Sequence, residues 1–390
     1  MSYKVRTRDE HYQNDGTPKR ILALDGGGLR GILTLGFLAR IEALLRDRHG
    51  AGDEFRLCHY FDLIAGTSTG AIIAAALASG WTVADLEKCY LELGRKVFQR
   101  SFFRDGYVRA KYDKDGLIEE LKNLLGGDTT MGSARLQTGL LIVTKRLDSG
   151  SPWPIGNNPR GKYFSQSTES KAIANSDYPL WRVVRASTAA PMYFDPETIT
   201  IIDQAGKDPV DGCFVDGGVS PFNNPSLQAL MYATLEGYRV GWPAGAEKLM
   251  LVSVGTGARD PSLKPIQITA GHAVQSLTAL MDDCAALIET MMQWMSSSPT
   301  ARSIDRELGD LRHDRLAPMP LLSYLRYNVE LSPERVRELK PDLTDQKKIA
   351  SLSAMDDPKN MPVLQELGVL AAEQLVHSND FASHFDLPSP

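Results

Sequence analysis

Residues 61–81 decide the fold class, and they read FDLIAGTSTGAIIAAALASGW. The stretch begins as a short apolar strand, turns between Gly66 and Gly70, and continues as an Ala-rich helix that Gly80 stops. Its 21 residues carry one charge, on Asp62, and are long enough to cross a bilayer. The turn residues in the middle interrupt such a span, so the pattern favours a buried strand, a turn and a buried helix.

A second strand–turn–helix unit lies upstream in the chain. Residues 21–24 are an apolar strand, residues 26–28 are a glycine turn, and residues 29–48 have apolar positions at helical spacing. Two such units in succession predict an α/β fold with a mainly parallel sheet and helices packed on its faces. Further short strands are expected at residues 140–144, 214–215, 249–254 and 321–331, with a loop at residues 149–162.

Composition limits the classes of function. The chain has 390 residues, of which 43% are hydrophobic, enough apolar material for a large core. Its net charge of -5 gives no bulk attraction to nucleic acid, so no nucleic acid polymer is expected as a partner. The polar N-terminus lacks a secretory signal, and the four scattered cysteines form no zinc or disulfide pattern, so a cytoplasmic location is expected.

The chain divides into three expected parts. Residues 1–17 are charged and polar, so we expect a flexible arm. Residues 18–265 contain the strand–helix units, and residues 266–390 are expected to be a mostly helical region packed on or extending the same domain. An apolar seam at helical spacing runs through Val274, Leu277, Met281, Cys284, Ile288, Met291 and Met295. It predicts a helix docked on the core, with an oligomer contact or a lipid-facing helix as alternatives.

Ser68 is the candidate nucleophile. It stands at the centre of Gly66-Thr67-Ser68-Thr69-Gly70, a G-x-S-x-G motif between a strand and a helix. Such a sharp turn exposes the serine oxygen, and its glycines are needed where side chains would clash with the strand and helix packing. The following helix also directs the positive end of its dipole toward the site.

A serine needs a base, and Asp216 is the candidate. Asp216, Gly217 and Gly218 directly follow the expected strand at residues 214–215. Asp216 is therefore placed at the carboxyl edge of the sheet, where open α/β folds bind their ligands. Taken by itself, an Asp-Gly-Gly triplet more often marks an ordinary turn.

Gly26, Gly27 and Gly28 are the candidate donors to an oxyanion. Three residues without side chains let backbone N–H groups converge on one point. Arg30, two residues later, has two candidate roles: an ion pair that holds this turn, or attraction of an anionic head group.

Two other interpretations are less favoured. Gly26, Gly28 and Gly31 satisfy the dinucleotide-binding pattern G-x-G-x-x-G, but the acidic residue expected after the next strand is replaced by the turn around Ser68. A Ser-His-Asp hydrolase needs a late histidine in a turn after a strand. The late histidines are His272, His313, His377 and His384, and none of them lies in such a turn.

Together these motifs resemble the patatin-like phospholipase family. The resemblance lies in residues 25–31 (DGGGLRG), 66–70 (GTSTG), 216–218 (DGG), 185–191 (RASTAAP) and 223–225 (NNP). It covers about residues 18–260, and it implies that residues 18–265 are the catalytic domain of a three-layer α/β/α fold.

The resemblance also implies a mechanism: a Ser–Asp dyad without histidine, calcium, other metal or cofactor. Ser68 would attack an ester and Asp216 would accept its proton, giving an acyl-enzyme that water hydrolyses to fatty acid and lysolipid. Gly26, Gly27 and Gly28 would form the oxyanion hole. The supporting residues would be Arg30, Gly66, Gly70, Gly217 and Gly218.

The resemblance further implies membrane phospholipid as substrate and peripheral contact with the membrane surface. Some bacterial relatives of this size are activated by cyclic nucleotides in antiviral defence, so a cyclic-nucleotide-activated phospholipase is the alternative expectation. The region after residue 265 is the candidate for that control or for a homo-oligomer contact. The competing class is a binding or signalling protein whose hydrolase residues are inactive.

Overall fold

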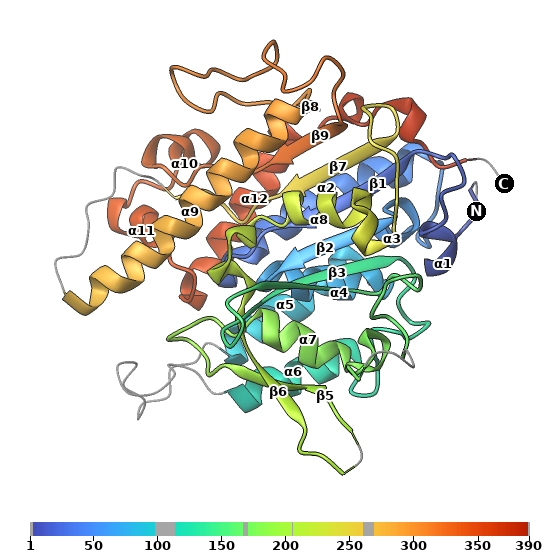
Figure 1. The fold of residues 1–390 in the computed structure, drawn as a ribbon. Coiled ribbons are helices and arrows are strands. Elements are labelled where there is room, and N and C mark those ends of the chain that lie inside the picture. Colours follow the sequence, from blue (N-terminus) through green and yellow to red (C-terminus); the bar gives the residue numbers. More distant parts are fainter. Residues whose placement is uncertain (1–2, 98–113, 167–170, 205, 260–268, 389–390) are drawn as a thin grey trace.

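The computed structural model describes residues 3–97, 114–166, 171–204, 206–259 and 269–388. Within these ranges the chain builds a nine-stranded sheet in the order β5-β6-β3-β2-β1-β7-β9-β8, with β4 paired to β3 (Figure 1). The strands are β1 (Lys19–Leu24), β2 (Leu63–Thr67), β3 (Gly139–Arg146), β4 (Pro152–Gly156), β5 (Glu197–Ile202), β6 (Val210–Asp216), β7 (Leu249–Val254), β8 (Ser296–Ser297) and β9 (Leu322–Tyr327).

The centre of the sheet is parallel, as the sequence predicts. Strand β1 pairs in parallel with β2 and β7, β2 with β3, and β7 with β9. The pairs made by β4, β5 and β6 are antiparallel. Every residue of β1, β2 and β7 is buried, the pattern of strands covered on both faces.

Helices cover both faces of the sheet and complete three layers. Along β1, Leu22 and Leu24 belong to one apolar core, whereas Ile21 and Ala23 belong to the other. The helices are α1 (Arg8–His11), α2 (Gly31–Arg48), α3 (Leu57–Tyr60), α4 (Thr69–Ala78), α5 (Val83–Val97), α6 (Lys114–Leu125), α7 (Leu180–Ser187), α8 (Ser226–Thr234), α9 (Thr269–Met295), α10 (Pro333–Leu339), α11 (Gln346–Ser351) and α12 (Met361–Leu375). The predicted fold class, α/β with a mainly parallel sheet, is confirmed.

Some local boundaries differ from the expectations. The strand before Ser68, expected at residues 60–65, spans Leu63–Thr67, and Tyr60 instead ends the short helix α3. The segment expected as a loop at residues 149–162 contains β4, which pairs antiparallel with β3. The apolar stretch at residues 61–81 folds as β2 and α4, and no helix in the described ranges is long and apolar enough to cross a membrane.

The C-terminal part joins the sheet and one helix layer. Strand β9 pairs with β7, and α12 packs against α2 so closely that a Cβ on Gly36 would lie 2.5 Å from the carbonyl carbon of Gly368. The boundary expected at residues 265–266 lies outside the described residues, as do the side chains of Val274 and Leu277.

Helix α9 has an inner and an outer face. Ile288 and Met292 are buried, and Met281 lies against the turn after β6. Leu280, Leu287 and Trp294, spaced seven residues apart, are exposed along the other face of this long helix. The helix therefore docks on the core along one face and leaves an apolar stripe outside.

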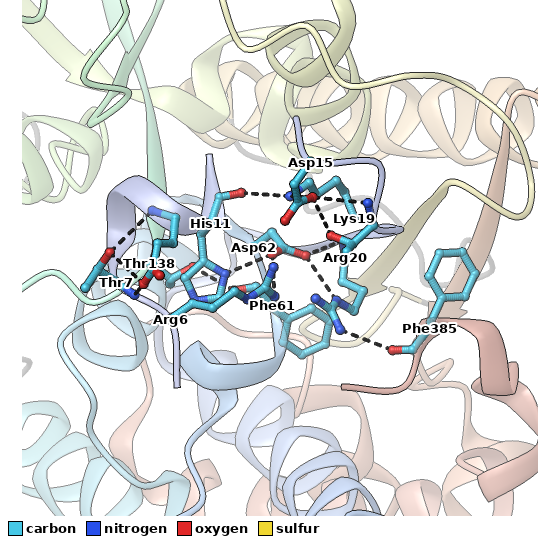
Figure 2. Close-up of polar contacts among 12 residues, drawn as sticks. Arg6, Thr7, His11, Asp15, Lys19, Arg20, Phe61, Asp62, Thr138 and Phe385 are labelled. Carbon is cyan, nitrogen blue, oxygen red and sulfur yellow. Dashed lines mark hydrogen bonds and ion pairs between the residues drawn. The ribbon is translucent and has the colours of Figure 1, made fainter. Parts of the chain in front are cut away.

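Within residues 1–17, expected as a flexible arm, the side chains of Tyr3, Arg6, His11 and Tyr12 are buried against the domain. The anchor of this segment is the buried carboxylate of Asp62, which pairs with Arg6 at 2.7 Å and accepts a hydrogen bond from His11 at 2.9 Å (Figure 2). Arg20 of β1 donates to the other oxygen of Asp62 through Nε and its backbone N–H. Charged residues that read as a solvated tail are thus the partners of a buried ion.

We expect Asp62→Asn to lower the free energy of unfolding by about 3–5 kcal/mol, because two buried guanidinium groups lose their counterion. Burial opposes the charge of Asp62, but Arg20 and Arg6 outweigh it and hold the pKa of that carboxyl well below its usual range. This stabilisation should therefore be present above about pH 4 and fade as the pH falls further. Urea denaturation at pH 7 and pH 3 measures both effects.

Asp128→Asn is the matched control, because the carboxyl of Asp128 is 96% exposed. The anchor role of Asp62 is wrong if both variants have the stability of the wild type at pH 7.

Candidate active site

Ser68 occupies a strained turn between β2 and α4. Its backbone has φ 54° and ψ -122°, a conformation that costs free energy for a residue with a side chain. The neighbouring turns are tight: a Cβ on Gly66 would lie 2.2 Å from the carbonyl oxygen of Gly70, and one on Gly70 would lie 2.2 Å from that of Leu24. The two glycines of the motif are therefore required by packing.

The structure brings Ser68 and Asp216 together. Ser68 Oγ donates a hydrogen bond to Asp216 Oδ2 at 2.5 Å, although 148 positions separate the two residues in the chain. Asp216 ends β6, and its other oxygen, Oδ1, accepts from the backbone N–H of Gly218 at 2.7 Å. Gly217 is also confined, because a Cβ there would lie 2.2 Å from the carbonyl oxygen of Val143.

The environment of Asp216 makes its carboxylate a stronger base than usual. The side chain is 4% exposed, and burial raises its pKa to about 6. Hydrogen bonds from Ser68 and Gly218, together with the charge of Arg185, oppose this rise. The result is a carboxylate that is ionised at neutral pH and has a raised affinity for a proton.

Ser187 fixes the backbone at the nucleophile. The N–H of Ser68 donates to Ser187 Oγ at 2.9 Å, and Ser187 Oγ donates to the carbonyl of Val143 at 2.6 Å. The N–H of Ser68 is therefore engaged and does not point at a ligand. Ser187 lies in the quoted segment 185–191, but the sequence carried no signal of this contact.

The glycine turn presents two unengaged amides. The N–H of Gly26 donates to the carbonyl of Asn223 at 3.0 Å, which removes Gly26 from the expected donors. Within the described residues, the N–H groups of Gly27 and Gly28 have no acceptor. Both residues line the same cavity as Ser68 and Asp216.

The carbonyls of this turn are held on the other side. Thr256 Oγ1 donates to the carbonyl of Gly26 at 3.0 Å, and the N–H of Arg30 donates to that of Gly27 at 3.3 Å. Thr256 and Asn223 are positioning residues; Thr256 lies outside the sequence motifs, and Asn223 lies in the segment 223–225 that carries the resemblance, without an expected role. Each comes from a loop after a later strand, so only the folded chain shows the contact.

Arg30 lies behind the turn. Its side chain is 3% exposed, and it is not among the residues that line the cavity. Burial lowers its pKa to about 10, with Asp282 as the largest opposing charge. Among the described residues Arg30 makes no ion pair within 4 Å, so the ion pair expected to hold this turn is not formed; attraction of an anionic head group stays a prediction.

The cavity above the dyad is apolar. Its volume is about 260 Å³, and its polar lining includes Ser68, Asp216 and the glycine turn. The other walls are mainly apolar side chains, among them Ile72, Leu93, Leu117, Met192, Phe194 and Met281. No histidine is part of this lining in the described chain. A few convergent polar groups in an apolar pocket are typical of a site that orients a hydrophobic ligand.

Comparison with known proteins agrees with this geometry. The family model of the patatin-like phospholipases matches residues 22–230, more than half of the chain. This chain belongs to the patatin-like phospholipase family. The matched range contains the glycine turn, Ser68 and Asp216.

Two curated family members are similar over most of the chain. A "cGAMP-activated phospholipase" of Vibrio cholerae is 31% identical over 66% of this chain and 68% of its own length. A "cUMP-AMP-activated phospholipase" of Escherichia coli is 32% identical over 68% of this chain and 73% of its own. Among solved structures, human GIVD cytosolic phospholipase A2 aligns with 92% of this chain and 59% of that chain, at 13% identity and a TM-score of 0.45.

With Asp216 as the base, we expect kcat/KM to rise with pH to a plateau, with a midpoint near pH 6. Below that pH the carboxyl is protonated and cannot accept the serine proton, so the rate should fall about tenfold per pH unit. Hydrolysis of a short soluble ester between pH 4 and 9 measures this profile, with circular dichroism at each pH as the control for folding. A rate that stays constant down to pH 4 would contradict the assignment.

Proposed function

We propose that this chain is a serine lipid acyl hydrolase of the phospholipase A type that acts through a Ser68–Asp216 dyad. The observation that carries the proposal is the 2.5 Å hydrogen bond from Ser68 Oγ to Asp216 Oδ2 beside two unengaged amides. An activated hydroxyl, a base and oxyanion donors are the three groups that acyl transfer requires.

The first half-reaction forms an acyl-enzyme. Ser68 Oγ attacks the ester carbonyl carbon while its proton passes to Asp216 Oδ2. The carbonyl oxygen gains negative charge and accepts hydrogen bonds from the N–H groups of Gly27 and Gly28. When the tetrahedral intermediate collapses, Asp216 returns the proton to the leaving alcohol, which departs as the lysolipid.

The second half-reaction releases the fatty acid. A water molecule takes the place of the leaving alcohol and gives one proton to Asp216 as its oxygen attacks the acyl carbon. The same two amides hold the second oxyanion. Collapse expels Ser68 Oγ, which recovers the proton from Asp216. Every step uses groups of this chain and water, so we propose that hydrolysis needs neither calcium nor a cofactor.

We further propose peripheral contact with a membrane, because the lining of the apolar cavity includes an exposed apolar side chain. Met192 lines the cavity and is 46% exposed. Met281 lines it from α9, and the outer face of the same helix carries the exposed Leu280 and Leu287. Exposed apolar side chains near the mouth of the cavity would favour contact with a bilayer from which an acyl chain could enter.

We expect Ser68→Ala and Asp216→Asn each to lower fatty acid release from phosphatidylcholine vesicles by at least about 1,000-fold, because each removes an essential group of the dyad. EDTA should leave the wild-type rate unchanged. A fluorophosphonate probe should label the wild type and not Ser68→Ala. The inactive Ser68→Ala chain should still sediment with the vesicles, which tests membrane contact without lipid loss.

Folding controls accompany these variants. Ionised Asp216 is buried, so Asp216→Asn should be at least as stable as the wild type at pH 8. Normal activity of Asp216→Asn would overturn the dyad. An unlabelled and inactive wild type, tested with and without candidate activators, would favour the competing class of a protein with inactive hydrolase residues.

A second candidate is a phospholipase that a cyclic nucleotide activates, as an effector of bacterial antiviral defence. The names of the similar proteins from Vibrio cholerae and Escherichia coli support it. The phospholipase chemistry would be the same, and the nucleotide would control access to it. A homo-oligomer, expected from the region after residue 265, stays a prediction.

For this candidate we expect the chain alone to hydrolyse vesicles slowly. The rate should rise at least about tenfold with one member of a panel of cyclic dinucleotides that includes cGAMP and cUMP-AMP. The reason is that a ligand that binds the active state more tightly raises the population of that state. Linear dinucleotides of the same bases are the control. The same rate with every nucleotide would remove the activator and leave the hydrolase proposal intact.

A further inference from the structure

Tyr90 links the glycine turn to the nucleophile turn. It lies on α5, is 3% exposed and lines the cavity of the site. Its hydroxyl donates to the carbonyl of Gly28 at 2.7 Å and makes a second, short hydrogen bond with the hydroxyl of Thr69. Thr69 directly follows Ser68, so one tyrosine oxygen touches both halves of the site.

The direction of these hydrogen bonds follows from the groups involved. A carbonyl oxygen can only accept, so the single proton of the Tyr90 hydroxyl is given to Gly28. The Tyr90 oxygen must then accept the proton of Thr69 Oγ1. The result is a directed chain from Thr69 through Tyr90 to Gly28, in which each bond polarises the next.

These hydrogen bonds constrain a glycine backbone that has little conformational preference of its own. Gly28 has φ +58°, and a Cβ there would lie 2.3 Å from the carbonyl oxygen of Met355, so a residue with a side chain does not fit. The peptide after Gly28 is held at both ends: Tyr90 binds its carbonyl, and its N–H, on Leu29, donates to Met355 at 2.7 Å. Since glycine visits many conformations, these outside contacts decide where the N–H of Gly28 points.

We propose that Tyr90 is a positioning residue for acyl transfer, whose hydroxyl holds the amides of Gly27 and Gly28 in register with Ser68. The inference rests on the proposed function, because it matters only if these amides bind an oxyanion. Donors stabilise that charge when they lie about 2.7–3.1 Å from its final position. Without the hydroxyl, the Gly28 carbonyl keeps only the backbone N–H of Gly31 as a partner, and the contact that links the glycine turn to the nucleophile turn is lost.

The test is Tyr90→Phe, which keeps the ring and removes one oxygen. With a short soluble ester we expect kcat to fall about 10- to 100-fold, a part of the loss caused by deleting an oxyanion donor outright. KM should change by less than about threefold, because the misplaced amides act mainly in the transition state. A thermal melt of each variant reports whether the fold is retained.

Tyr60→Phe is the matched control. Tyr60 is also fully buried, but its hydroxyl has no hydrogen-bond partner in the described chain. The same chemical change there should leave kcat unchanged. This control separates the effect of losing the Tyr90 hydrogen bonds from the general effect on kcat of altering a buried tyrosine.

Variants of Thr69 test the same series of hydrogen bonds from its other end. Thr69→Val removes the donor to Tyr90 and should also lower kcat, whereas Thr69→Ser keeps a hydroxyl and should lose less. If the two residues act through the same series of hydrogen bonds, the Thr69→Val and Tyr90→Phe double variant should be no slower than the slower single variant. Thr69→Val also provides the measurement if Tyr90→Phe does not fold.

The outcomes separate this inference from the proposed function. A Tyr90→Phe enzyme with the kcat of Tyr60→Phe, beside an inactive Ser68→Ala, overturns the role of Tyr90 and leaves the dyad in place. A lower melting temperature with unchanged kcat also overturns it, since the residue is then only structural. Full activity of Ser68→Ala instead overturns the proposed function itself.

Discussion

The parallel register of β1 and β2 is the constraint on which the site depends. Leu24 pairs with Gly66, so both strands end at the same edge and their turns lie side by side. Helix α4 then approaches β1 so closely that only glycine fits at position 70, beside the carbonyl of Leu24. The nucleophile turn and the oxyanion donors are thus positioned by one strand pair. Asp216 arrives from the antiparallel strand β6, two places along the sheet from β2.

Two buried aspartates show how neighbours decide the behaviour of the same side chain. Asp62 is surrounded by cations that hold its pKa low, so its charge stabilises the fold at neutral pH. Asp216 has hydrogen-bond donors and the more distant charge of Arg185, and burial raises its pKa from 3.8 to about 6. Above that pH, keeping Asp216 ionised costs the folded state roughly 3 kcal/mol. The first arrangement suits an anchor, and the second suits a base.

Much of this organisation could be predicted from the sequence, because local patterns encode it. Apolar runs bounded by glycine turns gave the central strands and the α/β class, and the spacing of the motifs gave the candidate dyad and turn. Contacts that depend on distant residues carried no local signal. The amide of Gly26 is occupied by Asn223, and Arg6 and His11 contact Asp62 far along the chain. Tyr90 sits within an ordinary amphipathic helix whose pattern reports burial and nothing about its hydroxyl.

In the glycine turn, the carbonyl groups have hydrogen-bond partners and two of the N–H groups, within the described part of the chain, do not. All three carbonyls are bound, by Thr256, by the backbone of Arg30 and by Tyr90, while two N–H groups in the cavity are not. These two donors face the cavity that Ser68 also lines, so they need no rearrangement when charge develops there. A charged oxygen formed at this point gains more from these donors than the neutral carbonyl from which it forms. The interaction is therefore strongest in the transition state, which is the condition for lowering a barrier rather than for tighter binding of substrate.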